Sequence, residues 1–200
     1  LSGQPVSIYN APLRSAEDAN RKTRAARALA EVVGCCTHRC TGSEAFAGLG
    51  PACYDMDHDL GTRYFDRFMK FLDYVQRNDL TCTVTVTDVK GLRTLAPHEQ
   101  PDPDMYVHVN EVRDDGIVIS GYKCNQTGIL FAHEIVIVPT TNMRPEDKAF
   151  ALACAVPADT PGLTFVLGRT PQDKRFFEVG GDIEGIDFGK KYADHQALVY

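Results

Sequence analysis

The first 79 residues contain two segments in which apolar side chains recur at helical spacing. Residues 15–33 begin with Ser15, followed three positions later by Asp18, an arrangement that resembles a capping box ahead of good helix formers. Residues 62–78 carry one broad apolar stripe at spacings of three and four, made of Tyr64, Phe65, Phe68, Phe71, Leu72 and Val75. The pattern predicts a helix in each segment and places the aromatic stripe in the core.

After residue 79 the pattern changes from helical to alternating, which is typical of strands. Residues 81–90, TCTVTVTDVK, direct Cys82, Val84 and Val86 to one face and four threonines to the other, which is expected to face solvent. Residues 106–112 and 116–122 flank Arg-Asp-Asp-Gly and predict a hairpin, and further strands are predicted within residues 134–140, 162–169 and 195–200. The prolines in residues 96–106 predict a loop without regular structure.

Helices first and strands afterwards favour an α+β fold, with a helical part at residues 1–79 and an antiparallel β part at residues 80–200. Residues 48–53, GLGPAC, lack both a preceding strand and a third glycine, so they do not predict a dinucleotide-binding loop. The chain begins with Leu1 and ends in the strand-like run HQALVY, from which we expect it to be part of a longer protein.

Composition and charge narrow the classes of partner. The 200 residues carry a net charge of −6, so no overall basic field attracts nucleic acid or an anionic membrane. No apolar run reaches the roughly 18 residues of a membrane span, and the N-terminus lacks a signal pattern, so a cytoplasmic protein is expected. Seven cysteines is an odd number in a chain this long, which favours reduced thiols over a disulfide framework.

The segment VVGCCTHRCTG at residues 32–42 holds the strongest candidate for metal chemistry. Cys36 and Cys40 are four positions apart, so on a helix their thiols share one face and can occupy two corners of a metal centre. Cys35 and His38 point elsewhere. A structural zinc needs two further ligands, usually a second close pair, and the sequence shows no such pair. Spacing alone favours buried, inert thiols over a metal site.

Six stretches of sequence follow a known family in register along nearly the whole chain: CTHRCTGSEAF, YVQRNDL, TDVKGLR with LAP, DDGIVISGYKCNQTG, AHEIVIVPT and ADTPGLTFVLGR. They resemble the 4-hydroxybutyryl-CoA dehydratases, which are also vinylacetyl-CoA isomerases and belong with the 4-hydroxyphenylacetate 3-hydroxylase flavoproteins. The resemblance implies an acyl-CoA dehydrogenase-like fold: a helical domain, a β-barrel-like middle domain, and a C-terminal helical bundle that these residues do not include.

The resemblance implies a [4Fe-4S] cluster held by three cysteines and one histidine. Cys36 and Cys40 match the family's Cys-x-x-x-Cys pair. The other two ligands would lie beyond residue 200, so His38 is not expected to be the histidine ligand. Thiolates suit iron–sulfur clusters, and a histidine in place of the fourth cysteine leaves one iron more open to act as a Lewis acid. The related hydroxylases bind flavin but no cluster, so this pair separates the two functions.

The resemblance also implies a bound FAD, contacted by two patches whose residues match Thr85, Val86, Lys90, Arg93, Gln126 and Thr127. Thr127 is expected to be catalytic, because the matching residue hydrogen-bonds near the reactive ring nitrogen. Lys90 and Arg93 can meet phosphate or ring oxygens. Without the resemblance, the threonines would be ordinary strand residues and the two cations would flank a turn. His133 and Glu134 could exchange protons, but a structural histidine is favoured.

For the parent protein, the resemblance implies a tetrameric lyase that converts 4-hydroxybutyryl-CoA to crotonyl-CoA and isomerises vinylacetyl-CoA, with the segment alone inactive. Gln196 departs from the family, which has a functional glutamate at that position, and an amide cannot exchange a proton as a carboxylate can. Two alternatives stay open. One is an FAD-dependent aromatic monooxygenase like 4-hydroxyphenylacetate 3-hydroxylase, and the other is a non-catalytic acyl-CoA-binding relative.

Overall fold

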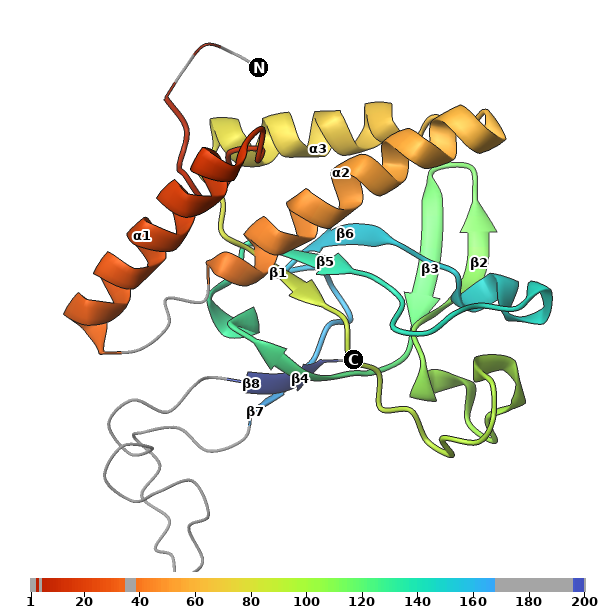
Figure 1. The fold of residues 1–200 in the computed structure, drawn as a ribbon. Coiled ribbons are helices and arrows are strands. Elements are labelled where there is room, and N and C mark those ends of the chain that lie inside the picture. Colours follow the sequence, from red (N-terminus) through yellow and green to blue (C-terminus); the bar gives the residue numbers. More distant parts are fainter. Residues whose placement is uncertain (1–2, 4, 35–38, 168–195, 200) are drawn as a thin grey trace, which may run out of the picture. The chain divides into compact units, whose positions relative to one another are not determined.

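The computed structural model describes residues 3, 5–34, 39–167 and 196–199 (Figure 1). The chain forms two compact units, a helical unit at Leu1–Thr83 and a β unit at Val84–Tyr200. This mixture of helices and sheets agrees with the change of periodicity along the sequence. None of the helices in the described ranges is long and apolar enough to cross a membrane.

Helix α1, Ala16–Val33, confirms the first predicted helix. Ser15 is its N-cap, and the Ser15 hydroxyl accepts a hydrogen bond from the Asp18 N–H at 3.1 Å. The Asp18 carboxylate accepts from the Arg14 N–H at 3.0 Å, one residue before the cap, rather than from Ser15 itself. Gly34, with φ 76°, ends the helix in the left-handed conformation that glycine adopts at low cost.

Helix α2, Cys40–Leu60, is not predicted by the sequence pattern. Its interior contains residue types that disfavour helices, namely Gly42, Gly48, Gly50 and Pro51. Packing accounts for two of them, because a side chain at Gly42 would overlap the Cys82 backbone and one at Gly50 would crowd the Phe68 ring. Tertiary contact at these positions therefore outweighs the low helix propensity that hides the element in the sequence.

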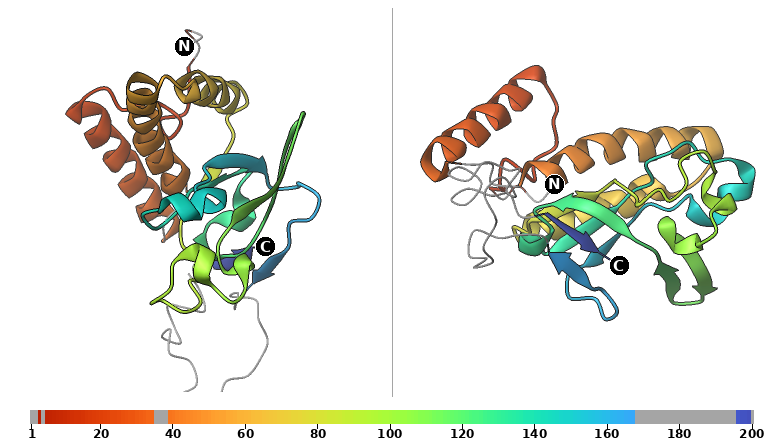
Figure 2. Two further views of the ribbon diagram at one scale, coloured as in Figure 1. Left: turned by 90° about the vertical axis from the view of Figure 1, so that its right-hand side faces the viewer. Right: turned by 90° about the horizontal axis from the view of Figure 1, so that it is seen from below.

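Helix α3, Tyr64–Arg77, confirms the second predicted helix and packs along α2 (Figures 1 and 2). Leu72 and Val75 of its apolar stripe are buried, as expected. Phe46 of α2 lies edge-on to Phe68 and Phe71, with ring centroids 6.5 and 6.2 Å apart. Tyr64, at the start of the stripe, is 41% exposed, so the prediction of a core position is wrong there.

The turn between α2 and α3 is held by Asp57. Its carboxylate accepts hydrogen bonds from the Thr62 hydroxyl at 2.6 Å, the Tyr64 N–H at 2.7 Å and the Phe65 N–H at 2.9 Å. Arg63, the residue at the N-cap of α3, makes no side-chain capping bond, so Asp57 supplies the acceptor that the first turn needs. Desolvation opposes ionisation of Asp57, but these hydrogen bonds outweigh it and lower the pKa of the carboxyl below its ordinary value.

In the described residues the strands form three small sheets. Strands β1 (Cys82–Thr85), β5 (Glu134–Ile137) and β6 (Cys154–Pro157) make one sheet in the order β1-β5-β6. Strands β2 (His108–Arg113) and β3 (Gly116–Ser120) form the predicted antiparallel hairpin. Strands β4 (Lys123–Thr127), β8 (Gln196–Val199) and β7 (Phe165–Leu167) make the third sheet in the order β4-β8-β7. These strands do not close into a barrel within the described part of the chain.

Several local features of the β unit differ from the sequence-based expectations. Strands β4 and β6 are not predicted. The proline-rich loop contains two short 3-10 helices, η1 (Pro97–Glu99) and η2 (Pro103–Met105), so the expectation of no regular structure is wrong there. Each begins with proline, which is tolerated at a helix start because its missing N–H has no partner to lose. Two more 3-10 helices follow, η3 (Ile129–Phe131) and η4 (Pro145–Phe150).

The threonines of β1 do not face solvent, contrary to the expectation. Thr83 is 1% exposed and Thr85 is fully buried, whereas Val86 is 38% exposed. The Thr85 hydroxyl donates to the Val136 carbonyl at 3.2 Å, and the Thr83 hydroxyl lies 3.4 Å from that of Thr41. Hydroxyls with such partners can be buried at little cost, so alternation alone does not identify the covered face.

Gly42 and Gly48 of α2 provide a matched pair of substitutions. Gly42→Ala is expected to destabilise the protein by about 1–3 kcal/mol, because the added Cβ would overlap the Cys82 carbonyl. Gly48→Ala places its Cβ in open space and is expected to stabilise the helix by roughly 0.5–1 kcal/mol. Urea unfolding followed by circular dichroism checks both, and equal effects of the two substitutions would contradict the close approach at Gly42.

Asp57 is expected to make stability depend on pH. Its pKa is lowered in the folded state, so its contribution is present above the ordinary value of 3.8 and is lost as the pH falls from there through the folded-state pKa. Thermal unfolding between pH 7 and pH 2 should therefore show a smaller loss of stability in Asp57→Asn than in the wild-type protein. Asp55→Asn, at an exposed position on the same helix, serves as the control and should retain the wild-type profile.

Candidate functional site

Two adjoining segments of the β unit carry the residues expected to contact flavin. The first is residues 85–93, which run from the end of β1 into a turn, and the second is β4. The Cys124 N–H donates to the Thr87 carbonyl at 2.9 Å, and Asp88 forms an isolated antiparallel bridge with Lys123. The fold therefore brings together the two patches that the sequence comparison treats separately.

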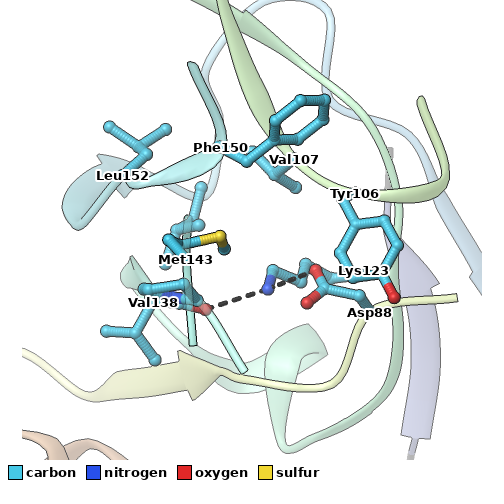
Figure 3. A pocket seen from close by; sticks show the side chains of 10 residues that line it. Asp88, Tyr106, Val107, Lys123, Val138, Met143, Phe150 and Leu152 are labelled. Carbon is cyan, nitrogen blue, oxygen red and sulfur yellow. Dashed lines mark hydrogen bonds and ion pairs between the residues drawn. The ribbon is translucent and has the colours of Figure 1, made fainter. Parts of the chain in front are cut away.

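A buried ion pair joins the two segments (Figure 3). The Lys123 ammonium lies 2.5 Å from Asp88 Oδ1 and donates to the carbonyls of Val86 and Val138, each at 2.9 Å. The Thr140 hydroxyl donates to Asp88 Oδ2 at 2.5 Å. Burial lowers the pKa of Lys123, and the hydrogen bond and charge of Asp88 oppose that shift.

The cavity that both Asp88 and Lys123 border is too small for a substrate. It has a volume of about 10 Å³ and is bordered by Asp88, Tyr106 and Lys123 on its polar side and by apolar residues such as Met143 and Phe150 (Figure 3). Such a volume holds at most one water molecule. Burial raises the pKa of the Tyr106 hydroxyl, and the Asp88 charge acts in the same direction. This arrangement is that of a packed polar interior rather than of a catalytic cleft.

A larger cavity of about 290 Å³ adjoins the small one, because Val107, Lys123 and Ile137 border both. Its wall is mainly apolar and includes Ile119, Ile135, Leu163 and Val199. Of the residues expected to contact flavin, Thr85 alone lines it. The outward-facing candidates therefore do not converge on this cavity.

Two of the expected flavin residues point inward. Thr85 is fully buried, and both its hydroxyl and its carbonyl bond to the neighbouring strand, at Val136 and Val138. Gln126 is 2% exposed, and its amide donates to the carbonyls of Thr87 at 3.0 Å and Cys124 at 2.5 Å. These side chains hold the strands together and leave little surface for a ligand.

The other expected flavin residues reach the surface to different degrees. Val86 and Arg93 are exposed, and Lys90 and Thr127 are half-buried. Lys90 has φ 72°, a left-handed conformation that non-glycine residues seldom adopt, at the start of the turn. The accessible set therefore offers two cations, one hydroxyl and one apolar side chain.

Gln100 fixes the turn that carries Lys90 and Arg93, and the sequence analysis does not single it out. Its side-chain carbonyl accepts from the Leu92 N–H at 3.0 Å, and its amide donates to the carbonyls of Leu92 at 2.9 Å and Leu95 at 3.2 Å. Only 8% of Gln100 is exposed. In the sequence, Gln100 is an ordinary loop residue between two prolines. Only the structure shows that it fixes the turn.

Strand pairing places Thr127 opposite Gln196, the position at which the family has a glutamate. Gln126 pairs with Ala197 and Lys123 with Val199 in the same ladder. The backbone register thus brings the departure from the family pattern next to the residue expected to be catalytic.

The cysteine pair is covered only in part. Cys36, Cys35 and His38 lie outside the described residues, and Cys40 is the first residue of α2. Arg39, directly before it, pairs with Asp79 at 3.1 Å and stacks over the Tyr9 ring at 5.7 Å. The described ranges contain no group of three or more histidine, cysteine or acidic side chains placed to hold a metal ion. A metal centre at Cys36 and Cys40 stays a prediction.

Comparison with known proteins identifies the family. The chain matches the family described as 4-hydroxyphenylacetate 3-hydroxylase N terminal over residues 1–199. It is 38% identical over 200 residues to 4-hydroxybutyryl-CoA dehydratase/vinylacetyl-CoA-Delta-isomerase from Clostridium aminobutyricum, which covers 100% of this chain and 40% of that protein. The oxygenase component of 4-hydroxyphenylacetate 3-monooxygenase from Thermus thermophilus is 36% identical over 123 residues, covering 60% of this chain and 24% of that protein.

Solved structures agree. An oxygen-tolerant archaeal 4-hydroxybutyryl-CoA dehydratase from N. maritimus has a TM-score of 0.87 at 34% identity, covering 99% of this chain and 39% of that chain. The oxygenase component of 4-hydroxyphenylacetate 3-monooxygenase complexed with FAD has a TM-score of 0.70 at 22% identity, covering 100% and 40%, a likeness of fold alone. This chain thus spans about two fifths of the dehydratases it matches. It belongs to the 4-hydroxyphenylacetate 3-hydroxylase N-terminal family and, within it, resembles 4-hydroxybutyryl-CoA dehydratase over its whole length.

Proposed function

We propose that this chain supplies the N-terminal and middle parts of an FAD- and [4Fe-4S]-dependent 4-hydroxybutyryl-CoA dehydratase that also isomerises vinylacetyl-CoA. The observation that carries the proposal is the extent of the match. Similarity to the dehydratase of Clostridium aminobutyricum covers 100% of the chain, whereas similarity to the monooxygenase of Thermus thermophilus covers 60%. The parent protein would share the dehydratases' acyl-CoA substrate, with the acyl-CoA dehydrogenase-like fold and tetrameric assembly that the resemblance implies.

The accessible residues of the β unit suit a flavin. Lys90 and Arg93 would bind phosphate or ring oxygens, Val86 would pack against the ring system, and the Thr127 hydroxyl would bond near its reactive nitrogen. Thr85 and Gln126 would support the flavin-contacting residues without binding the flavin themselves, because their polar side-chain atoms already donate to backbone carbonyls of neighbouring segments. When bound, FAD supplies one-electron chemistry that no amino-acid side chain of this set provides.

The donor chemistry of Cys36 and Cys40 suits an iron–sulfur cluster. Two thiols four positions apart can provide two of the four ligands, and thiolate is the usual ligand of such clusters. Under this proposal the remaining histidine and cysteine come from outside these 200 residues. The cysteine pair would anchor the cluster, while the open iron would provide the Lewis-acid chemistry.

Gln196 limits how far the dehydratase activity carries over. The position lies opposite Thr127 in the β4–β8 ladder, next to the proposed flavin contact. An amide neither accepts nor releases a proton at neutral pH, so a step that uses the family's glutamate would need another group. We therefore propose that isomerisation is retained more fully than dehydration.

Cofactor content tests the proposal. Protein expressed from its complete gene and purified without oxygen is expected to contain FAD together with equal amounts of iron and acid-labile sulfide. Cys36→Ser and Cys40→Ser should each lose iron and sulfide while retaining FAD. Cys35→Ser is the matched control and should keep both cofactors, because Cys35 is not one of the two cysteines that match the family's Cys-x-x-x-Cys pair.

The outcomes separate the alternatives. Flavin without iron in the wild-type protein would overturn the dehydratase proposal in favour of a monooxygenase that uses reduced FAD and oxygen. An intact cluster and flavin with no formation of crotonyl-CoA from either acyl-CoA substrate would favour a non-catalytic relative. Crotonyl-CoA formation is followed by absorbance.

Arg93 should contribute directly to flavin affinity. Arg93→Ala is expected to weaken FAD binding about tenfold, the effect of losing ~1.4 kcal/mol, because an exposed cation that meets a phosphate is removed. Fluorescence titration of the flavin-free protein measures this. Arg113→Ala removes an exposed arginine that pairs with Glu111 on the β2–β3 hairpin and should leave the affinity unchanged. Equal affinities of wild-type protein and Arg93→Ala would remove Arg93 from the site.

A further inference from the structure

The strand β4 is irregular where it meets residues 86–88. Its register shifts between Lys123 and Gln126, so three steps along β4 match two along β8, from Val199 to Ala197. Asn125, inside this bulge, has φ 55°, a left-handed conformation that asparagine tolerates better than most residues. In a regular strand, side chains three positions apart would point to opposite faces. Here Lys123 and Gln126 are both 2% exposed.

The bulge turns both side chains onto the same neighbouring segment. Lys123 donates to the Val86 carbonyl and Gln126 to the Thr87 carbonyl, at 2.9 and 3.0 Å. The Cys124 N–H donates to Thr87 as well, at 2.9 Å. Three hydrogen bonds from β4 therefore fix two consecutive residues of the segment that leads to Lys90.

Lys123 has no donor left for a ligand. An ammonium group has three N–H donors, and those of Lys123 have three acceptors: Asp88 Oδ1 and the carbonyls of Val86 and Val138. The second carboxylate oxygen of Asp88 accepts a hydrogen bond from the Thr140 hydroxyl. With side-chain exposures of 3% and 2%, neither charge reaches solvent. The pair is thus a structural connector rather than an acid or base.

We propose that the buried Asp88–Lys123 pair is a positioning device that sets the distance between the two flavin-contacting segments, residues 86–93 and the Gln126–Thr127 end of β4. The inference rests on the proposed flavin site and deepens it by assigning residues that act through others. A buried pair suits this task, because a charge displaced from its partner is strongly unfavourable, whereas apolar contacts tolerate sliding. Under this proposal, the geometry of the Asp88–Lys123 pair sets the spacing between Val86, Lys90 and Thr127.

Replacing both charges at once tests the role without leaving one of them unpaired. The double variant Asp88→Asn/Lys123→Met, in protein expressed from its complete gene, is expected to fold but to bind FAD about tenfold more weakly. Its bound flavin should also show a changed visible spectrum at saturating FAD, which a general loss of stability would not cause. Circular dichroism and fluorescence titration provide the measurements.

A histidine–aspartate contact in the same unit, in which only the aspartate is buried, provides the control. His98 Nδ1 lies 2.7 Å from Asp147 Oδ1, Asp147 is fully buried, and neither contacts residues 86–93 by a hydrogen bond that the structure describes. His98→Gln/Asp147→Asn should lower the melting temperature while leaving FAD affinity and spectrum unchanged. Thr140→Val is a milder variant that keeps the ion pair, and it is expected to weaken FAD binding about threefold by freeing Asp88 Oδ2.

The outcomes are distinct. Wild-type affinity and spectrum in Asp88→Asn/Lys123→Met overturn the positioning role, and if that variant does not fold, wild-type affinity in Thr140→Val does the same. Loss of affinity in the His98 and Asp147 control to the same degree also overturns it, since the effect would then be one of general stability. A wild-type protein that binds no FAD overturns the proposed function and this inference together.

Discussion

The ion pair between Asp88 and Lys123 is the interaction on which the organisation of the β unit depends. A buried charge without a partner costs several kcal/mol, so both side chains must reach the same point at the same time. Meeting that condition brings together the end of β1, strand β4 and the residues after β5, through Val86, Lys123 and Val138. Two of the three sheets seen in the described residues are thereby connected by side-chain bonds to backbone carbonyls.

In the helical unit, neutral side chains and the half-buried carboxylate of Asp57 likewise provide partners for polar groups. Asp57 completes the first turn of α3 from the end of α2. At the other end of α3, the Gln76 amide donates to the Asn10 carbonyl at 2.8 Å and the Asn10 amide to the Leu80 carbonyl at 3.1 Å. Backbone groups that have no partner within a helix end or turn therefore form hydrogen bonds with side chains from other segments. The bonds of Asn10 and Gln76 fix the N-terminal segment against α3.

These long-range partners explain which parts of the structure the sequence predicts. Helices α1 and α3 and the β2–β3 hairpin depend on local periodicity and turn residues, and the sequence predicts them. Helix α2 escapes prediction because Gly42 serves a contact with Cys82, which propensity does not register. Strand β4 escapes because its bulge interrupts the alternation that identifies strands. The burial of Thr83 and Thr85 depends on what covers β1, and that is tertiary information.

The candidate site contains two kinds of side chain: some bond the strands to one another, and others reach the surface. The sequence does not distinguish them. Sequence resemblance groups Thr85 and Gln126 with Arg93 and Thr127, because a motif does not record which way a side chain points. In the structure the first two are buried and bonded to backbone. The scaffold also needs Asp88 and Lys123, which lie in the matching stretches but are not among the expected flavin residues. Chemistry can therefore change at outward positions while the inward set keeps the segments in register.

Gln196 shows how a change of side-chain chemistry would affect the strand pairing under the proposed function. Exchanging a carboxylate for an amide of nearly equal size alters proton exchange but not strand length, and the backbone ladder from Thr127 to Gln196 needs no side chain. The pairing would survive either residue, since its hydrogen bonds run through main-chain groups. A relative could thus lose the dehydration step and keep its flavin geometry, because the groups that set that geometry are the buried ones on β4 and residues 86–88.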